Sequence, residues 1–381
     1  MEFAWSTEQL ALRDAVLEFG RRALQDDVRE RDSAAQFSHE LWKRCAEFGI
    51  QGLPFPESYG GRGCDIMSTV LAFEALGQAC RDNGLLFGLN AQMWSVQMPI
   101  YRFGTEDQKR KYLPQLCDGS LIGAHGMTEP DSGSDAFSLR TTAARRGDRY
   151  VLNGSKTFVS NAPVAGIFVV FASVDPKKGV LGLMGLLVDR DTPGFRVSRP
   201  IGKMGLRTSP MAELVFEDCE VPVENRLGRE GRGASIFDDS MEWERSCILA
   251  PFLGTMQRQL DLCVQHARQR RQFGKRIGDF QAVSGRLVQM KVRLETARLV
   301  LYRAAWAKQQ GRSAAAEAAI AKLYISEAAL QSSLDAVQIH GGYGFTTEYE
   351  FERYVRDAVG GRLYSGTSEM QAAIIARTLG V

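Results

Sequence analysis

Paired cysteines are absent from this sequence. Its seven cysteines are scattered over 381 residues and include no Cys-x-x-Cys pair, so neither a disulfide framework nor a zinc site is expected. Hydrophobic runs of the ~20 residues that cross a bilayer are also missing. The net charge is only +2, which gives no general attraction to nucleic acid or to an anionic membrane. We therefore expect a cytoplasmic protein that binds no metal.

The start of the chain carries no targeting pattern. The residues MEFAWSTEQ combine acidic side chains with a helical period, which is unlike a signal peptide or a transit peptide. The composition, 44% apolar and 24% charged, is that of an ordinary enzyme. The length suggests two or three domains around large cores.

The hydrophobic pattern changes twice along the chain. It is helical from residue 6 to about 118, and short β-branched runs then alternate with turns, including a hairpin signal at Asn153-Gly154. Helical patterns return beyond this region, with a first long helix expected at about 234–266. The sequence therefore predicts a mainly helical α+β fold in three parts: an N-terminal helical domain (1–120), a middle β domain (121–232) and a C-terminal four-helix bundle (233–381).

Three stretches carry side chains suited to a flat, phosphorylated ligand. GMTEPDSGSD (126–135) supplies hydroxyls around a glycine, and NGSKTFVSN (153–161) places Phe158 and Ser160 on one side of a strand. RQRRQFGKRIGDFQ (268–281) gathers five positive charges, and guanidinium groups bind diphosphates well. Taken singly, each stretch is more typical of a polar loop, a half-buried hairpin or a solvated charged face.

A fourth stretch lies near the C-terminus. Gly341, Gly342 and Gly344 allow close approach of a ligand to the backbone. The segment Tyr364-Ser365-Gly366-Thr367-Ser368 then opens the last helix, and its N–H groups point toward whatever lies before that helix. His125 and His340 lie inside such motifs, but with no second ligand at suitable spacing both are expected to be structural.

In this order, the strings TEPDSGSD, NGSKTFVSN, RRQFGK, FQAV, QIHGGYG and SGTSEMQ resemble the acyl-CoA dehydrogenases. The likeness covers essentially the whole chain, including its helical–β–helical order. It implies a homotetramer that binds FAD, with part of each site reaching from a neighbouring subunit. The FAD contacts that it implies are Met127, Thr128, Ser134, Phe158, Ser160, Arg270, Phe273, Gln281, Gln338, Gly342, Thr367 and Glu369. The family usually has Trp at the place of Phe158 and Thr at that of Ser160, and these changes keep the ring and the hydroxyl.

The catalytic base departs from the usual pattern of the family. The resemblance implies a carboxylate just before Gly-Thr-Ser, where this chain has Ser365, a hydroxyl too weakly basic for the task. One branch, which includes isovaleryl-CoA dehydrogenase, instead carries the base immediately before an arginine on an early bundle helix. Glu244 precedes Arg245 at that place. Glu242 would point about 200° away on the same helix.

Helix geometry adds an expectation about the surroundings of Glu244. Ile248 and Pro251 would share its helix face and form a dry wall against the carboxylate. Partial burial would raise the pKa of Glu244 toward a value useful for a base.

These resemblances imply FAD-dependent α,β-dehydrogenation of an acyl thioester. Glu244 would be the general base, hydride would pass to flavin N5, and the Ser365 backbone N–H would bind the thioester carbonyl, with Arg245 and Gly366 also contacting substrate. The string GGRLYSGTSEMQ resembles enzymes that act on acyl or aminoacyl groups of a carrier protein, such as prolyl-carrier-protein dehydrogenases. The electron acceptor would be an electron-transfer flavoprotein or oxygen.

Three alternatives remain open on the sequence. The first is a dehydrogenase of short branched acyl-CoA. The second is a flavin monooxygenase or N-hydroxylase on the same fold, which needs no base at position 244 or 365. The third is a relative that binds without catalysis.

Overall fold

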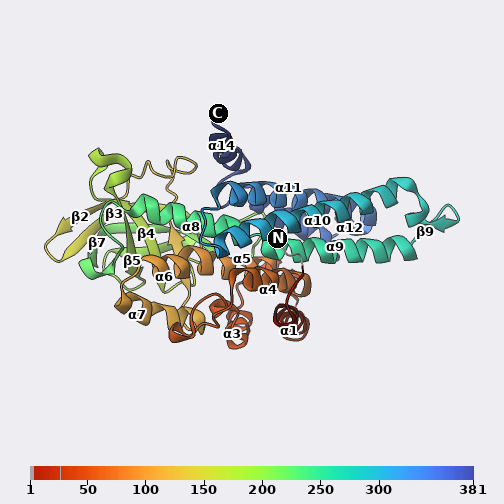
Figure 1. Cartoon of the computed structure of the whole chain (residues 1–381), viewed down its shortest axis with the longest axis horizontal. Coiled ribbons are helices and arrows are strands. Elements are labelled where there is room, and N and C mark those ends of the chain that lie inside the picture. The colour runs from red at the N-terminus through yellow and green to blue at the C-terminus, as the bar shows by residue number, and fades with distance from the viewer. Residues whose placement is uncertain (1–3, 26) are drawn as a thin grey trace.

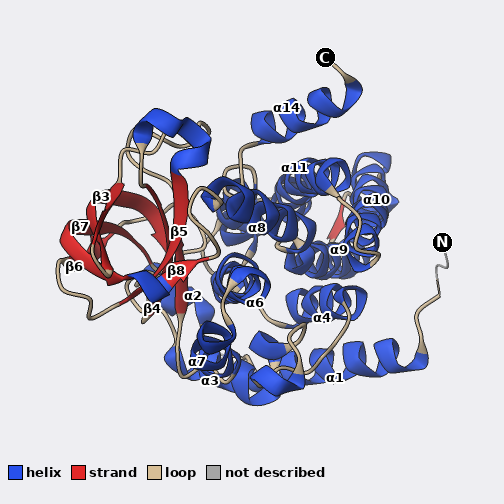
Figure 2. Cartoon of the chain, turned by 60° about the vertical axis from the view of Figure 1, so that its left-hand side comes forward, coloured by secondary structure: helices blue, strands red, loops and turns tan. Residues whose placement is uncertain are grey.

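The chain passes from a layer of helices through a β-sheet into a long helical bundle, in a computed structural model that describes residues 4–25 and 27–381 (Figure 1). This is the predicted helical–β–helical order. Figure 2 shows the strands on one side and the bundle on the other, with α6 and α8 between them. Within the described residues, no helix combines the length and apolar character needed to cross a membrane.

The N-terminal helices begin at polar caps that the sequence supplies. Ser6 with Gln9 and Thr105 with Gln108 form capping boxes at α1 and α7, and Asp82 caps α5. The helices of this part are α1 (Thr7–Ala23), α2 (Val28–Ser33), α3 (His39–Phe48), α4 (Ile66–Ala79), α5 (Asn83–Gln92), the π-helical turn η3 (Met93–Gln97), α6 (Met98–Phe103) and α7 (Glu106–Cys117).

The middle part is one mixed sheet with the strand order β6-β7-β3-β2-β4-β5-β8, and β1 pairs in parallel with β4. The central strand β4 is buried along its whole length. The strands are β1 (Gly123–Gly126), β2 (Thr142–Arg146), β3 (Arg149–Ser160), β4 (Ile167–Ser173), β5 (Leu183–Asp189), β6 (Phe195–Pro200), β7 (Met211–Pro222) and β8 (Arg226–Leu227).

The hairpin expected at Asn153-Gly154 is wrong. Both residues lie inside β3, where the register against β7 shifts between Leu152 and Gly154. Gly154 has φ +143°, and a Cβ there would lie 2.6 Å from Thr141 Oγ1. The glycine therefore serves a bulge with close backbone approach rather than a turn.

The C-terminal part is built around α9, α10 and α11, with α8 and α13 packed against α11 (Figure 1). The expected helix at 234–266 is in fact two helices, because the helix is interrupted at residues 248 and 249 and resumes at Ala250, with Pro251 in the first turn. The elements are α8 (Gly233–Cys247), α9 (Ala250–Gln269), β9 (Arg271–Gln272), β10 (Lys275–Arg276), α10 (Gln281–Gln309), α11 (Ala315–His340), α12 (Gly342–Phe345), α13 (Phe351–Gly361) and α14 (Ser368–Leu379).

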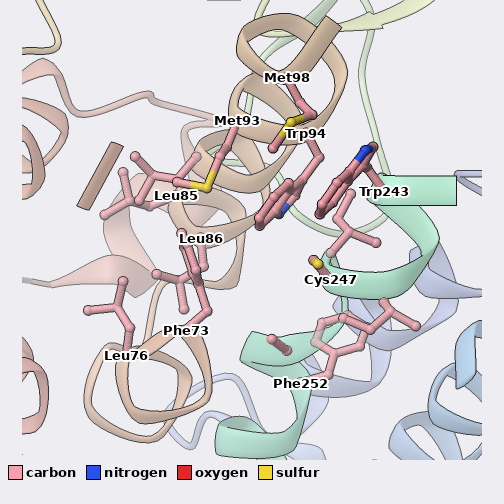
Figure 3. Packing of buried hydrophobic residues seen from close by; sticks show 14 of the residues in the cluster. Phe73, Leu76, Leu85, Leu86, Met93, Trp94, Met98, Trp243, Cys247 and Phe252 are labelled. Carbon is pink, nitrogen blue, oxygen red and sulfur yellow. The ribbon is translucent and has the colours of Figure 1, made fainter. Parts of the chain in front are cut away.

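The core joins the N-terminal helices to α8 and α9. Figure 3 shows Phe73, Leu76 and Leu86 facing Phe252 and Cys247 in this region. The helices α4 and α9 touch at two glycines, since a Cβ on Gly77 or on Gly254 would lie 2.0 Å from backbone oxygen of the other helix. This tight contact also holds α8, the helix that directly precedes α9, near the N-terminal layer.

Candidate active site

Glu244, on α8, is a buried carboxylate, and each of its two oxygens accepts a hydrogen bond from a serine hydroxyl. Ser95 Oγ donates a hydrogen bond to Oε2, and Ser365 Oγ donates one to Oε1. The three residues come from three separate elements: α8, η3 and the turn before α14. Only 7% of Glu244 is exposed, so the structure holds this carboxylate in one place and away from bulk water.

The surroundings of Glu244 change its acidity in opposite directions. Burial raises the pKa of the carboxyl above its usual range, because the charged form loses its hydration. The hydrogen bonds from Ser365 and Ser95 and the charges of Arg245 and Lys322 oppose that rise. The net result is a raised pKa, which suits a proton acceptor.

The other glutamate of α8 faces elsewhere. Glu242 accepts hydrogen bonds from Lys308 Nζ at 2.9 Å and from the Ala314 backbone N–H at 2.9 Å. The two carboxylates therefore point in different directions, as the helical spacing predicted. Half of the expected wall is wrong, because Pro251 belongs to α9 and packs against α4 instead. Ile248 is buried one helical turn after Glu244, and its N–H donates to the Glu244 carbonyl at 2.8 Å.

Ser95 was not found from the sequence. It lies in η3, a π-helical turn inserted between α5 and α6, and such turns often accompany functional sites. The neighbouring Trp94 stacks in parallel on Trp243 at 6.1 Å between ring centres (Figure 3). Trp94 directly precedes Ser95, and Trp243 directly precedes Glu244. The stacked tryptophans therefore bring the hydrogen-bonded side chains of Ser95 and Glu244 together.

The turn at Ser365 and Gly366 is left-handed at both residues, with φ of +57° and +88°. Arg245 Nε donates to the Ser365 carbonyl at 2.9 Å, and Lys322 Nζ donates to the Gly366 carbonyl at 2.6 Å. Gln371 Nε2 reaches both carbonyl oxygens, at 3.2 and 2.9 Å. The carbonyls are thus turned inward and held by side chains.

The same turn also offers two backbone N–H groups as hydrogen-bond donors. Among the described residues, the backbone N–H groups of Ser365 and Gly366 have no acceptor. Fixed N–H groups beside a reacting carbon are what binds a carbonyl oxygen that gains charge. Lys322, which the sequence analysis also missed, is buried, and burial lowers its pKa to about 8.

The β domain brings the first group of predicted cofactor residues together. The Thr157 N–H donates to the Thr128 carbonyl at 2.8 Å, which joins the loop of Thr128 and Ser134 to the end of β3. Met127 is buried, and its carbonyl accepts a hydrogen bond from Lys156 Nζ. Phe158 and Ser160 follow at the end of β3.

Phe158 has the unusual backbone of a bulge, with φ +56°, and 61% of it is exposed. In the part of the chain that the structure describes, its ring has no aromatic contact. Gly133, in the neighbouring loop, has open space where a Cβ would stand. An uncovered ring beside an open backbone is a surface to which a flat ligand can bind.

The second group of predicted cofactor residues lies at the other end of the molecule. Arg270, Phe273, Gln281, Gln338 and Gly342 surround the junction of α9, β9 and α11, and β9 and the sheet occupy opposite ends of the long axis (Figure 1). One chain therefore does not bring this group to Phe158.

The five residues of this second group are all exposed. Arg270 lies 6.0 Å from the ring of Tyr343, next to Gly342. Phe273, in the turn between β9 and β10, is 93% exposed. Thr367 and Glu369 lie apart from this group, at the start of α14: Thr367 caps the helix by accepting from the Met370 N–H at 3.3 Å, and Glu369 is exposed in the first turn.

Both histidines of the motifs are packed as structural residues. His125 lies between Phe171 and Phe237, at 5.5 and 5.9 Å between ring centres. His340 stacks on Phe351 at 3.9 Å. Burial lowers the pKa of each to about 4.

Comparison with known proteins covers the whole chain. Profiles of acyl-CoA dehydrogenase domains match residues 6–120 (N-terminal domain), 124–219 (middle domain) and 231–380 (C-terminal domain). An L-prolyl-[peptidyl-carrier protein] dehydrogenase of Pseudomonas fluorescens is 48% identical over 90% of each chain.

Two solved structures are similar over nearly their full length. The prolyl acyl carrier protein oxidase AnaB superimposes with a TM-score of 0.98 and 48% identity, covering 99% of this chain and all of that one. PigA with FAD and proline gives 0.97 and 42% identity, covering 100% of this chain and 99% of that one.

Proposed function

Because this chain belongs to the acyl-CoA dehydrogenase family, we propose that it uses FAD to remove hydrogen from the α and β carbons of an acyl or aminoacyl thioester on a carrier protein. The observation that carries this proposal is the buried Glu244, whose two oxygens each accept a hydrogen bond from a serine hydroxyl, together with a turn at Ser365 and Gly366 whose N–H groups have no acceptor among the described residues. This is the arrangement that proton removal next to a thioester carbonyl requires.

The residues of the β domain fit FAD. Phe158 presents an uncovered ring face, Ser160 and Thr128 offer hydroxyls, and the backbone near Gly133 and Ser134 is open to an anion. These residues would hold the flavin ring and the diphosphate, with Met127 beside the ring. FAD, when bound, supplies the hydride acceptor, its N5 atom.

A second copy of the chain would complete the cofactor site. Arg270, Phe273, Gln281, Gln338 and Gly342 are remote from Phe158 in one chain but present bare aromatic and guanidinium groups. We propose that they bind the FAD of a neighbouring subunit in a homotetramer, while Thr367 and Glu369 contact it from the start of α14. We keep residues 1–120, 121–232 and 233–381 as the domains of each subunit.

The residues of the site divide the reaction between them. The thioester carbonyl would accept hydrogen bonds from the Ser365 N–H, with Gly366 beside it, and this stabilises the negative charge that develops as the α C–H bond breaks. Glu244 takes the α-proton on a carboxylate oxygen. Each oxygen accepts one hydroxyl hydrogen bond and keeps a further lone pair for that proton. Arg245 holds the turn through the Ser365 carbonyl.

The chemistry around Glu244 favours an amino acid as the acyl group. Ser95 and Ser365 each donate their single hydroxyl proton to the carboxylate, so only acceptor lone pairs remain to face a substrate. A prolyl group carries an N–H next to its α carbon and could satisfy such an acceptor. A branched hydrocarbon chain offers no donor to these lone pairs. The relatives named above as prolyl dehydrogenase and oxidase fit this preference.

We further propose that the enzyme acts in the cytoplasm and passes electrons to an electron-transfer flavoprotein or to oxygen. All seven cysteines are free thiols, as suits a reducing compartment. The rate of reoxidation of the reduced protein by each acceptor separates the two routes. Fast reaction with oxygen and formation of a hydroxylated product would instead support a monooxygenase.

The test of the function is anaerobic bleaching of the bound flavin. The FAD-loaded protein would be mixed with L-prolyl carrier protein, L-prolyl-CoA and isovaleryl-CoA. We expect the fastest bleaching with L-prolyl carrier protein. Equal or faster bleaching with isovaleryl-CoA would favour a branched acyl-CoA dehydrogenase, and no bleaching with any thioester would favour a binding protein without catalysis.

A further inference from the structure

One side of α8, called the path below, runs from beside Glu244 toward the surface of the β domain, and Glu244 itself points about 60° beyond the edge of this side. Ala234, Asp238, Met241 and Arg245 fall within about 60° of each other on the helix, and all but Met241 keep some exposure. Glu244 lies eleven positions after Gly233, so this path is about 16 Å long at 1.5 Å per residue.

The far end of this path meets an exposed turn between β4 and β5. This is η4 (Pro176–Gly182), which packs against the segment leading into α8. A Cβ on Gly231 would lie 2.7 Å from the Leu181 carbonyl oxygen, and one on Gly233 would lie 2.5 Å from the Met184 nitrogen. The two segments therefore present one continuous surface at the start of α8.

That surface combines positive charge with uncovered apolar side chains. Val180 is 48% and Leu181 70% exposed, so two adjacent apolar side chains stand uncovered here. We call the following residues the docking patch: Lys177, Lys178, Val180, Leu181, Arg229 and Arg232, all of them exposed.

The charges of the docking patch are largely unneutralised. Lys178 lies 3.6 Å from Asp175, whereas Lys177, Arg229 and Arg232 have no carboxylate partner among the described residues. The nearby Glu230 is already engaged by Tyr150 and Arg226. The patch therefore has a net positive field that would attract an anionic partner.

We propose that the docking patch binds the carrier protein itself, with the phosphopantetheine arm running along α8 to Glu244. This inference rests on the proposed function. The arm has about as many backbone atoms as five residues, which span roughly 17 Å when extended, so its length matches the path. Where the arm joins the carrier protein there is a phosphodiester, a permanent negative charge that the patch would meet.

The apolar residues of the docking patch favour a carrier protein over the nucleotide of CoA as its ligand. The phosphates of a CoA thioester would also be attracted by Lys177 and Arg229. Val180 and Leu181 offer nothing to a phosphate, but they match the apolar contacts that form the centre of a protein interface. The docking patch therefore discriminates carrier-bound from CoA-bound substrate.

The test compares two thioesters of the same acyl group. Lys177→Glu, Arg229→Glu and Leu181→Asp proteins, loaded with FAD, would be assayed with L-prolyl carrier protein and with L-prolyl pantetheine. We expect kcat/KM for the carrier-bound substrate to fall about tenfold or more in each variant, with unchanged kcat/KM for L-prolyl pantetheine. Lys43→Glu, an exposed change on α3, is the matched control and should alter neither.

Other outcomes overturn the inference in distinguishable ways. Equal losses with both thioesters would mean that these residues act on the site rather than on a carrier protein. The same variants would also be assayed with L-prolyl-CoA, and a loss there as large as with the carrier would assign the patch to the nucleotide. Unchanged kinetics with the carrier would exclude the patch alone, whereas a wild type that oxidises neither thioester would overturn the proposed function and this inference with it.

Discussion

Ser365 donates a hydrogen bond to Glu244 across 121 positions of the chain. The residue that stands where most relatives would be expected to carry their base is therefore in direct contact with the carboxylate proposed to replace it. Ser365 also belongs to the turn whose N–H groups have no acceptor in the described part of the chain. One small residue thus holds the base on one side and leaves room for a carbonyl on the other.

Glu244→Gln should abolish most of the chemistry while keeping the fold. Gln is nearly isosteric and can still accept a hydrogen bond from Ser95, but its amide cannot take the α-proton. We expect flavin reduction by substrate to slow by ~10²–10⁴, the contribution of a positioned general base. Stopped-flow bleaching of the flavin measures this rate. A variant that bleaches at the wild-type rate would contradict the role of Glu244 and favour the monooxygenase alternative.

Glu242→Gln provides the control on the same helix, with the opposite pattern. Lys308 has only 7% of its side chain exposed and depends on Glu242 for its charge partner. Loss of that partner should lower the free energy of unfolding by about 1–3 kcal/mol, as measured by urea denaturation. The bleaching rate of the folded protein should stay within about twofold of wild type. A large loss of rate would mean that Glu242 takes part in the reaction.

Ser365→Ala should shift the pH dependence more than the maximal rate. The Ser365 hydroxyl stabilises the charged form of Glu244, so its removal should raise the pKa of that carboxyl further. Since the base acts when ionised, the acidic limb of the rate profile should move to higher pH, while the plateau changes little. Ser95→Ala should move it in the same direction. A shift to lower pH in either variant would contradict the assigned hydrogen bonds.

Sequence patterns were sufficient for the parts of this molecule that depend on local periodicity and on motif strings. The change from helical to β texture near Leu121 matches the structure, and the family and its mainly helical three-part fold are confirmed. The opposite directions of Glu242 and Glu244 also followed from helix geometry alone.

The errors and omissions come from contacts between distant segments. Asn153-Gly154 is a strong turn signal, but pairing with β7 keeps both residues inside a strand. Ser95 lies 149 positions from Glu244, and the only local hint was a hydroxyl within an apolar helical stretch. Lys322 is similar, since nothing near it in the sequence indicates that its ammonium reaches the Gly366 carbonyl.

His125→Phe should reduce the loss of stability in mild acid. The folded-state pKa of His125 is lowered from 6.5 to about 4 by burial, with a further contribution from the charge of Lys156. Between these values the unfolded chain binds more protons than the folded one, so stability falls as pH drops from 6.5 to 4. Phe should pack against Phe171 and Phe237 and remove this dependence, worth up to ~1.4 kcal/mol per pH unit. Urea denaturation at pH 7, 6 and 5 compares the slopes, and equal slopes would show that the pKa of His125 is not lowered by folding.

Arg270→Ala should weaken retention of FAD, although Arg270 is remote from the cofactor residues in the β domain of its own chain. Arg270 lies beside Gly342 at the end of the bundle, remote from Phe158. If its guanidinium binds the diphosphate of a neighbouring subunit, its removal should raise the Kd for FAD roughly tenfold or more, since a charge-assisted contact is lost. Fluorescence of FAD released on gel filtration measures this. Arg268→Ala, an exposed arginine two positions earlier, is the matched control and should retain FAD. Full FAD occupancy in the Arg270→Ala protein would show that Arg270 does not bind FAD. A wild-type protein that is monomeric and still retains FAD would show that no neighbouring subunit is needed.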